Sequence, residues 1–367
     1  MPNTKSTTPD FLLVLVTLTL LSIGLIMVYS ASAVWASYNY GDSFYFAKRQ
    51  LLFAGLGVVA MFFVMNIEYW TWRKWSKIGL AVCFLLLILV LIPGVGEVHG
   101  GARSWLGVGA FSVQPSEFTK IALILFLAKF LSENQRNITS FRKGMLPSLA
   151  LVVLAFGIIM LQPDFGTGVV LVGTCTIMIY TSGARMAHFA GLGLLGLAGF
   201  AALILSAPYR LKRITSFLDP WSDPLGAGFQ IIQSLYAIGP GGLLGFGLGH
   251  SRQKFQYLPE PQTDFIFAIL AEELGFIGAS LVLLLFCLLL WRGIRIALGA
   301  PDLYGSLLAV GIIAMVAVQV MINIAVVTGM MPVTGITLPF LSYGGSSLTL
   351  TLVSVGILLN VSRYAKY

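Results

Sequence analysis

The sequence predicts an all-α protein that crosses a membrane about ten times, on the basis of its composition and the spacing of its apolar runs. The chain has 367 residues, of which 57% are hydrophobic and only 10% are charged. Soluble domains are about 45–50% apolar and about 25% charged, and disordered chains are less hydrophobic still. Both classes are therefore excluded, and we predict a single transmembrane domain over residues 1–367.

The apolar residues form ten separate runs, which we predict as transmembrane helices. The first run resembles a secretory signal sequence. Its apolar core is too long for one, however, and Lys5 is a weak basic region, so we interpret it as an uncleaved anchor. The ten predicted spans are residues 11–29, 51–67, 78–92, 117–131, 147–161, 167–182, 187–206, 264–290, 305–328 and 342–361.

The basic residues predict the orientation of the chain. With ten spans, both termini lie on the same side of the membrane. That side holds thirteen Lys and Arg residues, whereas the opposite short loops hold three. Because basic residues are enriched in cytoplasmic loops, this asymmetry places both termini in the cytoplasm. The net charge of +8 follows from the same bias, so it does not indicate a nucleic-acid partner.

The three cysteines and three histidines are scattered, and they match neither a disulfide framework nor the spacing of metal ligands. A nucleotide fingerprint is missing as well. The glycine-rich GFGLGH at 245–250 has a histidine where the third glycine belongs, and it follows no predicted strand. The residues therefore identify no cofactor.

Residues 207–263 are predicted to form one large extracytoplasmic loop between spans seven and eight. Loops of this length are uncommon and often functional. Long loops are largely exempt from the charge rule, so another reason is needed for the basic residues Arg210, Lys212, Arg213, Arg252 and Lys254. Two interpretations of the strip 210–213 stay open: attraction to anionic lipid headgroups, or a clamp for a pyrophosphate.

Span four opens with an ion pair in the sequence. Pro115 precedes the first turn, Ser116 is a candidate N-cap, and Glu117 lies near the positive end of the helix. Lys120 lies one turn further on the same face. Glu117 and Lys120 either satisfy each other or face a substrate cavity together, and both alternatives stay open.

Span eight begins with an acidic residue and carries two more. Thr263 or Asp264 is a candidate N-cap. Glu272 and Glu273 lie about 12 Å deeper by helical rise. Charged acids at that depth need cations, water or a proton, and we expect Lys120 or the loop arginines to be the partners of Glu272.

Together these residues predict an outward-facing site with a carboxylate, several cations and apolar walls. Such a site suits an amphiphile that has an acyl tail and an anionic phosphate. A carboxylate can deprotonate an attacking hydroxyl, and cations can stabilise a departing pyrophosphate.

The last spans resemble a known family. Residues 323–347 read NIAVVTGMMPVTGITLPFLSYGGSS, which is similar to the signature of the SEDS family, the FtsW, RodA and SpoVE proteins. Further blocks of this kind are GARSW at 101–105, QPSE at 114–117, QPDFGT at 162–167, DPWSDP at 219–224 and PEPQTDFIFAILAEELG at 259–275. The resemblance covers nearly the whole chain, and it is strongest to the sporulation members. Many family members have Arg-Arg-Trp where this chain has Arg103-Ser104-Trp105.

The resemblance implies a ten-helix peptidoglycan glycosyltransferase. Such an enzyme polymerises lipid II on the outer face of the cytoplasmic membrane beside a class B penicillin-binding protein. For sporulation members, the partner is SpoVD-like, the product is spore cortex, and the site is the outer forespore membrane. The family's essential aspartate falls on Asp264, and its glutamate and lysine fall on Glu117 and Lys120. Arg103 and Ser342 are further candidates for substrate binding.

The residues and the resemblance together give a mechanistic hypothesis. Asp264 accepts the proton of the GlcNAc 4-hydroxyl of lipid II as that oxygen displaces undecaprenyl pyrophosphate from the growing strand. One inverting displacement needs no covalent enzyme intermediate. Arg210, Arg213 and Lys120 are expected to bind the pyrophosphate, and Glu272 to hold one of these cations. A divalent cation on the phosphates stays open, without a dedicated ligand cluster.

Three alternatives concern the function and the signature. A lipid II flippase or a non-catalytic scaffold for the transpeptidase would use the same fold. The glycine-rich end of the signature, 341–347, is explained either by close helix packing or by irregular backbone that lines a cavity.

Overall fold

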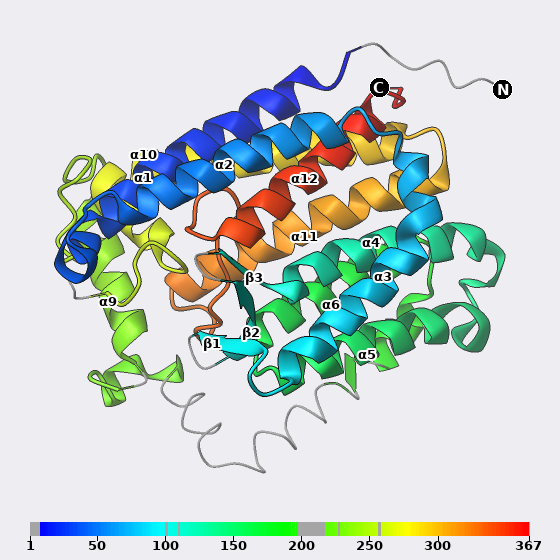
Figure 1. Cartoon of the computed structure of the whole chain (residues 1–367), viewed down its shortest axis with the longest axis horizontal. Helices are drawn as coiled ribbons and strands as arrows, with labels where there is room; N and C mark the ends of the chain where they lie inside the picture. Colours follow the sequence, from blue (N-terminus) through cyan, green and yellow to red (C-terminus); the bar gives the residue numbers. More distant parts are fainter. Residues whose placement is uncertain are drawn as a thin grey trace.

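The computed structural model describes residues 8–99, 102–108, 111–191, 193–194, 196, 217–226, 228–255 and 258–366. Its long helices lie side by side in one bundle (Figure 1). Helix α1 begins and helix α12 ends at the same end of the bundle, where the Asp10 amide donates to the Ser362 hydroxyl at 3.1 Å. The helices are α1 (Phe11–Tyr40), α2 (Tyr45–Val64), α3 (Tyr69–Leu91), α4 (Pro115–Glu133), α5 (Leu146–Leu161), α6 (Phe165–Thr181), α9 (Phe229–Ile238), α10 (Ile266–Gly299), α11 (Leu303–Val327) and α12 (Gly345–Ser362).

The helices identify the chain as a helical membrane protein. Within the described ranges, seven helices are long and apolar enough to cross a membrane. Helix α6 has 17 residues and is shorter, and α4 carries four charged side chains. Nine of the ten predicted spans coincide with helices α1 to α6 and α10 to α12. The seventh, 187–206, falls mostly outside the described residues.

Helices α11 and α12 form the centre of the bundle. Helix α12 packs mainly on α2, whereas α11 contacts α4, α6, α10 and α12. Small residues make the α2–α12 approach close: a side chain on Gly356 would come within 2.5 Å of the Met61 carbonyl oxygen. Without a hydrophobic driving force between helices in lipid, such close packing is a main source of association.

A small antiparallel sheet lies between α3 and α4, and it is a feature that the all-α prediction missed. Its strands β1 (Gly96–His99), β2 (Ala102–Val108) and β3 (Phe111–Val113) follow in chain order. Strand β2 contacts α3 and α4, and β3 contacts α12. The connecting chain satisfies its backbone groups by pairing with itself, which places Arg103 on the middle strand.

Helix α10 is broken at Gly275, whose φ of 65° and ψ of −168° leave the helix. The break frees backbone groups in the neighbouring turns, and buried groups of this kind need partners. Segment 242–247 supplies them through four hydrogen bonds of 2.8–3.1 Å: Phe246 to Glu272, Gly247 to Glu273, Phe276 to Gly242 and Ile277 to Leu243. The glycine-rich GFGLGH motif is therefore explained by this close backbone contact, since a side chain on Gly245 would lie 2.2 Å from the Glu273 carbonyl oxygen.

Candidate functional site

Asp264 lies in the turn just before α10, on the side of the bundle where α2 and α12 begin. The predicted capping role is wrong: the N-cap residue of α10 is Phe265, and no side chain caps the helix. The Asp264 side chain is partly exposed. It is therefore available for chemistry rather than committed to the end of the helix.

Three hydrogen bonds hold the Asp264 turn in place from α11 and from the loop after it. The Ser342 hydroxyl donates to the Thr263 carbonyl at 2.6 Å, and the Tyr343 amide donates to the Gln262 carbonyl at 2.8 Å. The Asn323 side chain donates to the Asp264 carbonyl at 2.8 Å. Together these bonds fix the backbone on which the carboxyl stands.

Asn323 and Ser342 also organise the loop between α11 and α12. The same Asn323 amide donates to the Ile336 carbonyl at 2.8 Å, and the Ser342 hydroxyl accepts from the Leu338 amide at 2.8 Å. Ser342 is buried, and its hydroxyl already donates one hydrogen bond and accepts another. The structure thus places Ser342, predicted to bind substrate, in a supporting position beneath Asp264.

Both explanations of the glycine-rich signature are seen in the structure, at different glycines. Residues 332–338 form irregular backbone, and a side chain on Gly335 would be 4.0 Å from the Asp264 carboxyl. The start of α12 packs closely instead, because a side chain on Gly345 would lie 2.7 Å from the Phe53 ring. The irregular stretch therefore borders the site, and the helix behind it is tightly packed.

The protein around the partly exposed Asp264 carboxyl removes much of its water and raises its pKa above the usual range, and its hydrogen bond with Thr263 opposes the shift only in part. Removal from water disfavours the charged form of an acid. An aspartate with a raised pKa is a stronger base than an ordinary one. This is the property that a general base needs near neutral pH.

Glu117 and Lys120 form an ion pair of 2.8 Å at the start of α4, with side chains only 9% and 3% exposed. The predicted N-cap, Ser116, is wrong: Gln114 occupies that position and makes no side-chain cap. Burial raises the pKa of nearby Asp164, on which Glu117 acts in the same direction and Lys120 in the opposite one. Asp164 accepts from the Gln114 amide at 2.9 Å and caps α6.

This charged cluster and Asp264 border the same loop. A side chain on Gly166, in the first turn of α6, would lie 2.4 Å from the Thr334 carbonyl oxygen. The next residue of that loop, Gly335, approaches Asp264. Segment 334–335 therefore lies between Asp264 and the first turn of α6, whose N-cap Asp164 interacts electrostatically with Glu117 and Lys120.

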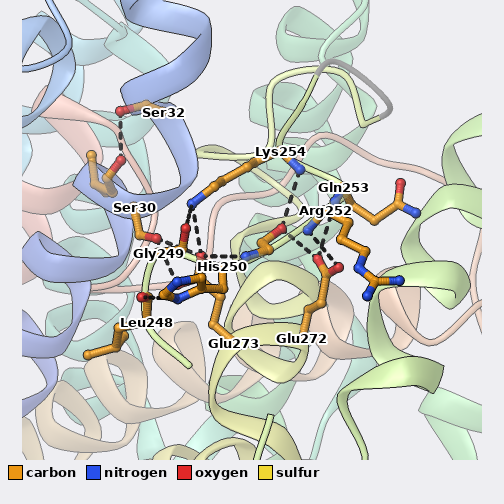
Figure 2. Close-up of polar contacts among 12 residues, drawn as sticks. Ser30, Ser32, Leu248, Gly249, His250, Arg252, Gln253, Lys254, Glu272 and Glu273 are labelled. Carbon is orange, nitrogen blue, oxygen red and sulfur yellow. Dashed lines mark hydrogen bonds and ion pairs between the residues drawn. The ribbon is translucent and has the colours of Figure 1, made fainter. Parts of the chain in front are cut away.

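Glu272 and Glu273 form a separate buried cluster (Figure 2). Glu272 accepts hydrogen bonds from the Arg252 amide at 2.9 Å and from the Ser251 hydroxyl. Glu273 accepts from the Ser30 hydroxyl at 2.7 Å and from the Ser251 amide at 3.2 Å. These carboxylates anchor the loop that precedes α10 to α10 and α1.

The cation in this cluster is Lys254, whereas Lys120 or the loop arginines were the expected partners. Lys254 lies 3.4 Å from Glu273, and both side chains are buried. Lys120 pairs with Glu117 instead. Glu272 accepts hydrogen bonds from the Ser251 hydroxyl and from the backbone amides of Arg252 and Gln253. Lys120 is therefore not the cation that Glu272 holds, and the prediction stays untested for Arg210 and Arg213, which lie outside the described residues.

The remaining predicted residues are placed as follows. Arg103 is half-buried on β2, on the strand that contacts α3 and α4. Arg210 and Arg213 lie outside the described residues. Among the residues that the structure describes, there is no group of three or more His, Cys, Asp or Glu side chains that could hold a metal ion.

Sequence reasoning missed the amide side chains that shape the site. Asn323 and Gln50 are buried within α11 and α2. The Gln50 amide donates to the Ser342 carbonyl at 2.9 Å, and its oxygen accepts from the Gly344 amide at 3.3 Å. A polar side chain inside an apolar span is a signal of function or of a buried network, and it was available in the sequence.

The chain is similar over its length to proteins of one known family. The model of the FtsW/RodA/SpoVE cell cycle protein family matches residues 11–367. The chain is 74% identical over 365 residues to stage V sporulation protein E of Bacillus subtilis strain 168, with 100% of each chain covered. It is 46% identical over 357 residues to a probable peptidoglycan glycosyltransferase FtsW of Trichlorobacter lovleyi, covering 97% of this chain and 94% of that protein.

A solved structure has the same fold. It is described as "Structural coordination of polymerization and crosslinking by a peptidoglycan synthase complex". One of its chains superposes with a TM-score of 0.82 and 34% identity, covering 97% of this chain and 98% of that one. The family match extends over nearly the whole chain, and the structural match agrees with it. The chain therefore belongs to the SEDS family, the FtsW/RodA/SpoVE family of cell cycle proteins.

Proposed function

We propose that this protein is a peptidoglycan glycosyltransferase that polymerises lipid II on the outer face of the cytoplasmic membrane, with Asp264 as general base. One observation carries the proposal: a carboxyl with a raised pKa stands on a turn fixed by Ser342, Tyr343 and Asn323. Family membership and the FtsW relative support the reaction class.

In the proposed reaction, the 4-hydroxyl oxygen of the GlcNAc of lipid II attacks the anomeric carbon of the growing strand. The bond from that carbon to the phosphate oxygen breaks as the new glycosidic bond forms. The hydroxyl proton passes to Asp264, and undecaprenyl pyrophosphate leaves with the bonding electrons. A single displacement converts the α-linked donor to a β-linked product.

The pyrophosphate needs cations. Arg210 and Arg213 are proposed for this role on sequence grounds alone. Lys120 is held by Glu117 at 2.8 Å, so it would act as part of that pair. Arg103 on β2 is a further candidate, because β2 contacts α4, the helix that carries the pair.

The wider setting is part of the proposal. We propose ten spans with both termini in the cytoplasm and a class B penicillin-binding protein, SpoVD-like, as partner. The sporulation relative supports a role in spore cortex synthesis at the outer forespore membrane. The solved structure of a peptidoglycan synthase complex supports the partner class.

The test is a lipid II polymerisation assay with and without the cognate transpeptidase. We expect glycan strands from the wild type and none from Asp264→Ala. A matched control is Glu68→Ala, which removes an exposed carboxylate outside the family-like blocks and is expected to polymerise normally. A substantial rate from Asp264→Ala would refute the assignment of the base.

The absence of strands from all variants, with the partner present and lipid II proven competent, would refute the enzyme. A translocation assay in liposomes would then test the flippase. Normal function of Asp264→Ala in cells would instead favour the scaffold.

A further inference from the structure

The connection between α1 and α2 is unusually rich in aromatic residues. Six of the twelve residues from 35 to 46 are Trp, Tyr or Phe, in a chain that is 12% aromatic overall. Aromatic residues are common at membrane interfaces, where each ring anchors the protein separately. In this connection the rings contact one another instead, and the arrangement calls for a different explanation.

The rings form an ordered stack. Tyr40 and Tyr45 are parallel within 4°, with their centroids 3.9 Å apart. The Arg49 guanidinium lies over the Tyr45 ring at 4.3 Å. Trp35 and Phe46 meet the Tyr40 ring edge-on at 5.8 and 5.9 Å. One face of the Tyr40 ring is therefore supported by Tyr45, and Trp35 and Phe46 make edge contacts with it.

A rigid turn holds Tyr40 at the end of α1. Gly41 ends the helix with a φ of 68° and bonds back to the Ser37 carbonyl. Asp42 accepts from the Phe44 amide at 2.9 Å and pairs with Lys48 at 2.8 Å. Despite this bracing, Tyr40 remains 50% exposed, and neighbouring Tyr38 is 79% exposed. The stack thus presents flat rings that are fixed before any ligand arrives.

The aromatic stack continues to the candidate active site. Phe46 meets the Tyr343 ring edge-on at 4.9 Å, and Arg49 lies beside the Tyr343 hydroxyl. The Tyr343 amide donates to the Gln262 carbonyl in the Asp264 turn. A path of aromatic and basic side chains therefore leads from Asp264 to the exposed end of α1.

We propose that this surface, Tyr38, Tyr40, Tyr45, Arg49 and Tyr343, binds the glycan strand as it leaves Asp264. The inference rests on the proposed function. The flat faces of β-linked pyranose rings carry C–H bonds that pack on the electron-rich faces of aromatic rings. The lactyl group of each alternate sugar is joined by an amide bond to a stem peptide, whose free carboxylates are anions that a guanidinium binds with two parallel hydrogen bonds.

Binding of soluble sugars tests the proposal without any need for polymerisation. The probes are lipid-free GlcNAc–MurNAc octasaccharides that keep their stem peptides, and so carry carboxylates, and neutral GlcNAc octasaccharides, both titrated calorimetrically into the purified full-length protein. We expect Tyr40→Leu to weaken binding of both probes about tenfold, which is about 1.4 kcal/mol. Arg49→Gln is expected to weaken binding of the carboxylate probe alone.

A matched control distinguishes this surface from any exposed tyrosine. Tyr180 on α6 is 52% exposed, nearly the same as Tyr40, and Tyr180→Leu is expected to bind both probes like the wild type. Tyr38→Leu changes a ring that is largely in solvent, so its expected loss of affinity cannot be attributed to misfolding. In the polymerisation assay, Tyr40→Leu is expected to shorten the glycan strands.

Several outcomes would overturn the proposal. Unchanged affinity in both Tyr38→Leu and Tyr40→Leu would do so, as would undetectable binding of either probe by the wild type. Loss of transpeptidase association with unchanged sugar affinity would assign the surface to a protein partner. Failure of the wild type to polymerise, with tyrosine-dependent sugar binding intact, would refute the proposed enzyme but not the sugar-binding surface.

Discussion

The ion pair between Lys254 and Glu273 offers a quantitative test of how the loop that precedes α10 is anchored. The two side chains are 6% and 0% exposed and lie 3.4 Å apart. Glu273 keeps two other donors, the Ser30 hydroxyl and the Ser251 amide. The informative change is Lys254→Met, which retains much of the apolar stem and removes the ammonium group.

The expected cost follows from the burial of the carboxylate. Breaking a buried pair by removing one partner typically costs about 3–5 kcal/mol, because the remaining charge is uncompensated. The two donors left on Glu273 place this case at the lower end, about 3 kcal/mol. Ser30→Ala removes one hydrogen bond to a charged group and should cost about 1.5–3 kcal/mol.

A double-mutant cycle isolates the interaction. Glu273→Gln in the Lys254→Met background removes the unpaired charge, so the double variant should be more stable than the sum of the two single effects predicts. Thermal unfolding in detergent can be followed with a thiol-reactive dye in a Cys287→Ser background, since Cys287 is exposed whereas Cys83 and Cys175 are buried until the protein unfolds.

The exposed pair between Arg73 and Glu133 serves as the control for this cycle. Its side chains are 39% and 43% exposed, so Glu133→Gln should cost less than about 1 kcal/mol. Strictly additive losses in the Lys254 and Glu273 cycle, or a Lys254→Met loss no larger than that of Glu133→Gln, would refute the reasoning.

Three further predictions concern the site and the fold. Since burial raises the pKa of Asp264 above 3.8, activity should be present above the raised pKa and lost as pH falls through it. Initial rates measured across pH test this, and a loss of activity only at or below pH 3.8 would contradict it. Ser342→Ala breaks the bond to Thr263 and should lower kcat about tenfold, about 1.4 kcal/mol, with the unfolding temperature measured alongside to exclude misfolding. Gly275→Ala places an alanine at a φ of 65° with its Cβ 2.3 Å from the Gly245 nitrogen, and this variant should unfold at a lower temperature than the wild type. Gly79→Ala has open space around the new Cβ, so its unfolding temperature should be unchanged or higher in the same measurement.

The sequence alone was sufficient for the membrane class and for most helix positions. Nine of the ten predicted spans coincide with helices, because a run of apolar residues long enough for the bilayer can satisfy its backbone only as a helix. It also singled out Asp264, Glu117 and Lys120, since charged groups at the ends of such runs are costly and therefore informative.

The ends of the helices were harder to predict than their positions. Ser116 and Asp264 are both favourable capping residues, yet neither caps its helix. Ser116 reaches toward Asp164 at 3.5 Å instead, and the Asp264 turn is bound to residues far along the chain. Tertiary contacts overrode the local preference in both cases.

The pairing of charges and the role of the glycines were decided by the tertiary structure. Glu273 and Lys254 are separated by 19 positions and Glu273 and Ser30 by 243, so their contact depends on how the loop folds back on α10. The close approach of Gly245 to the break at Gly275 likewise depends on how this loop folds back on α10. A hydropathy pattern specifies which face of a helix is buried, but the partner of a buried polar group depends on which segments the whole fold brings together.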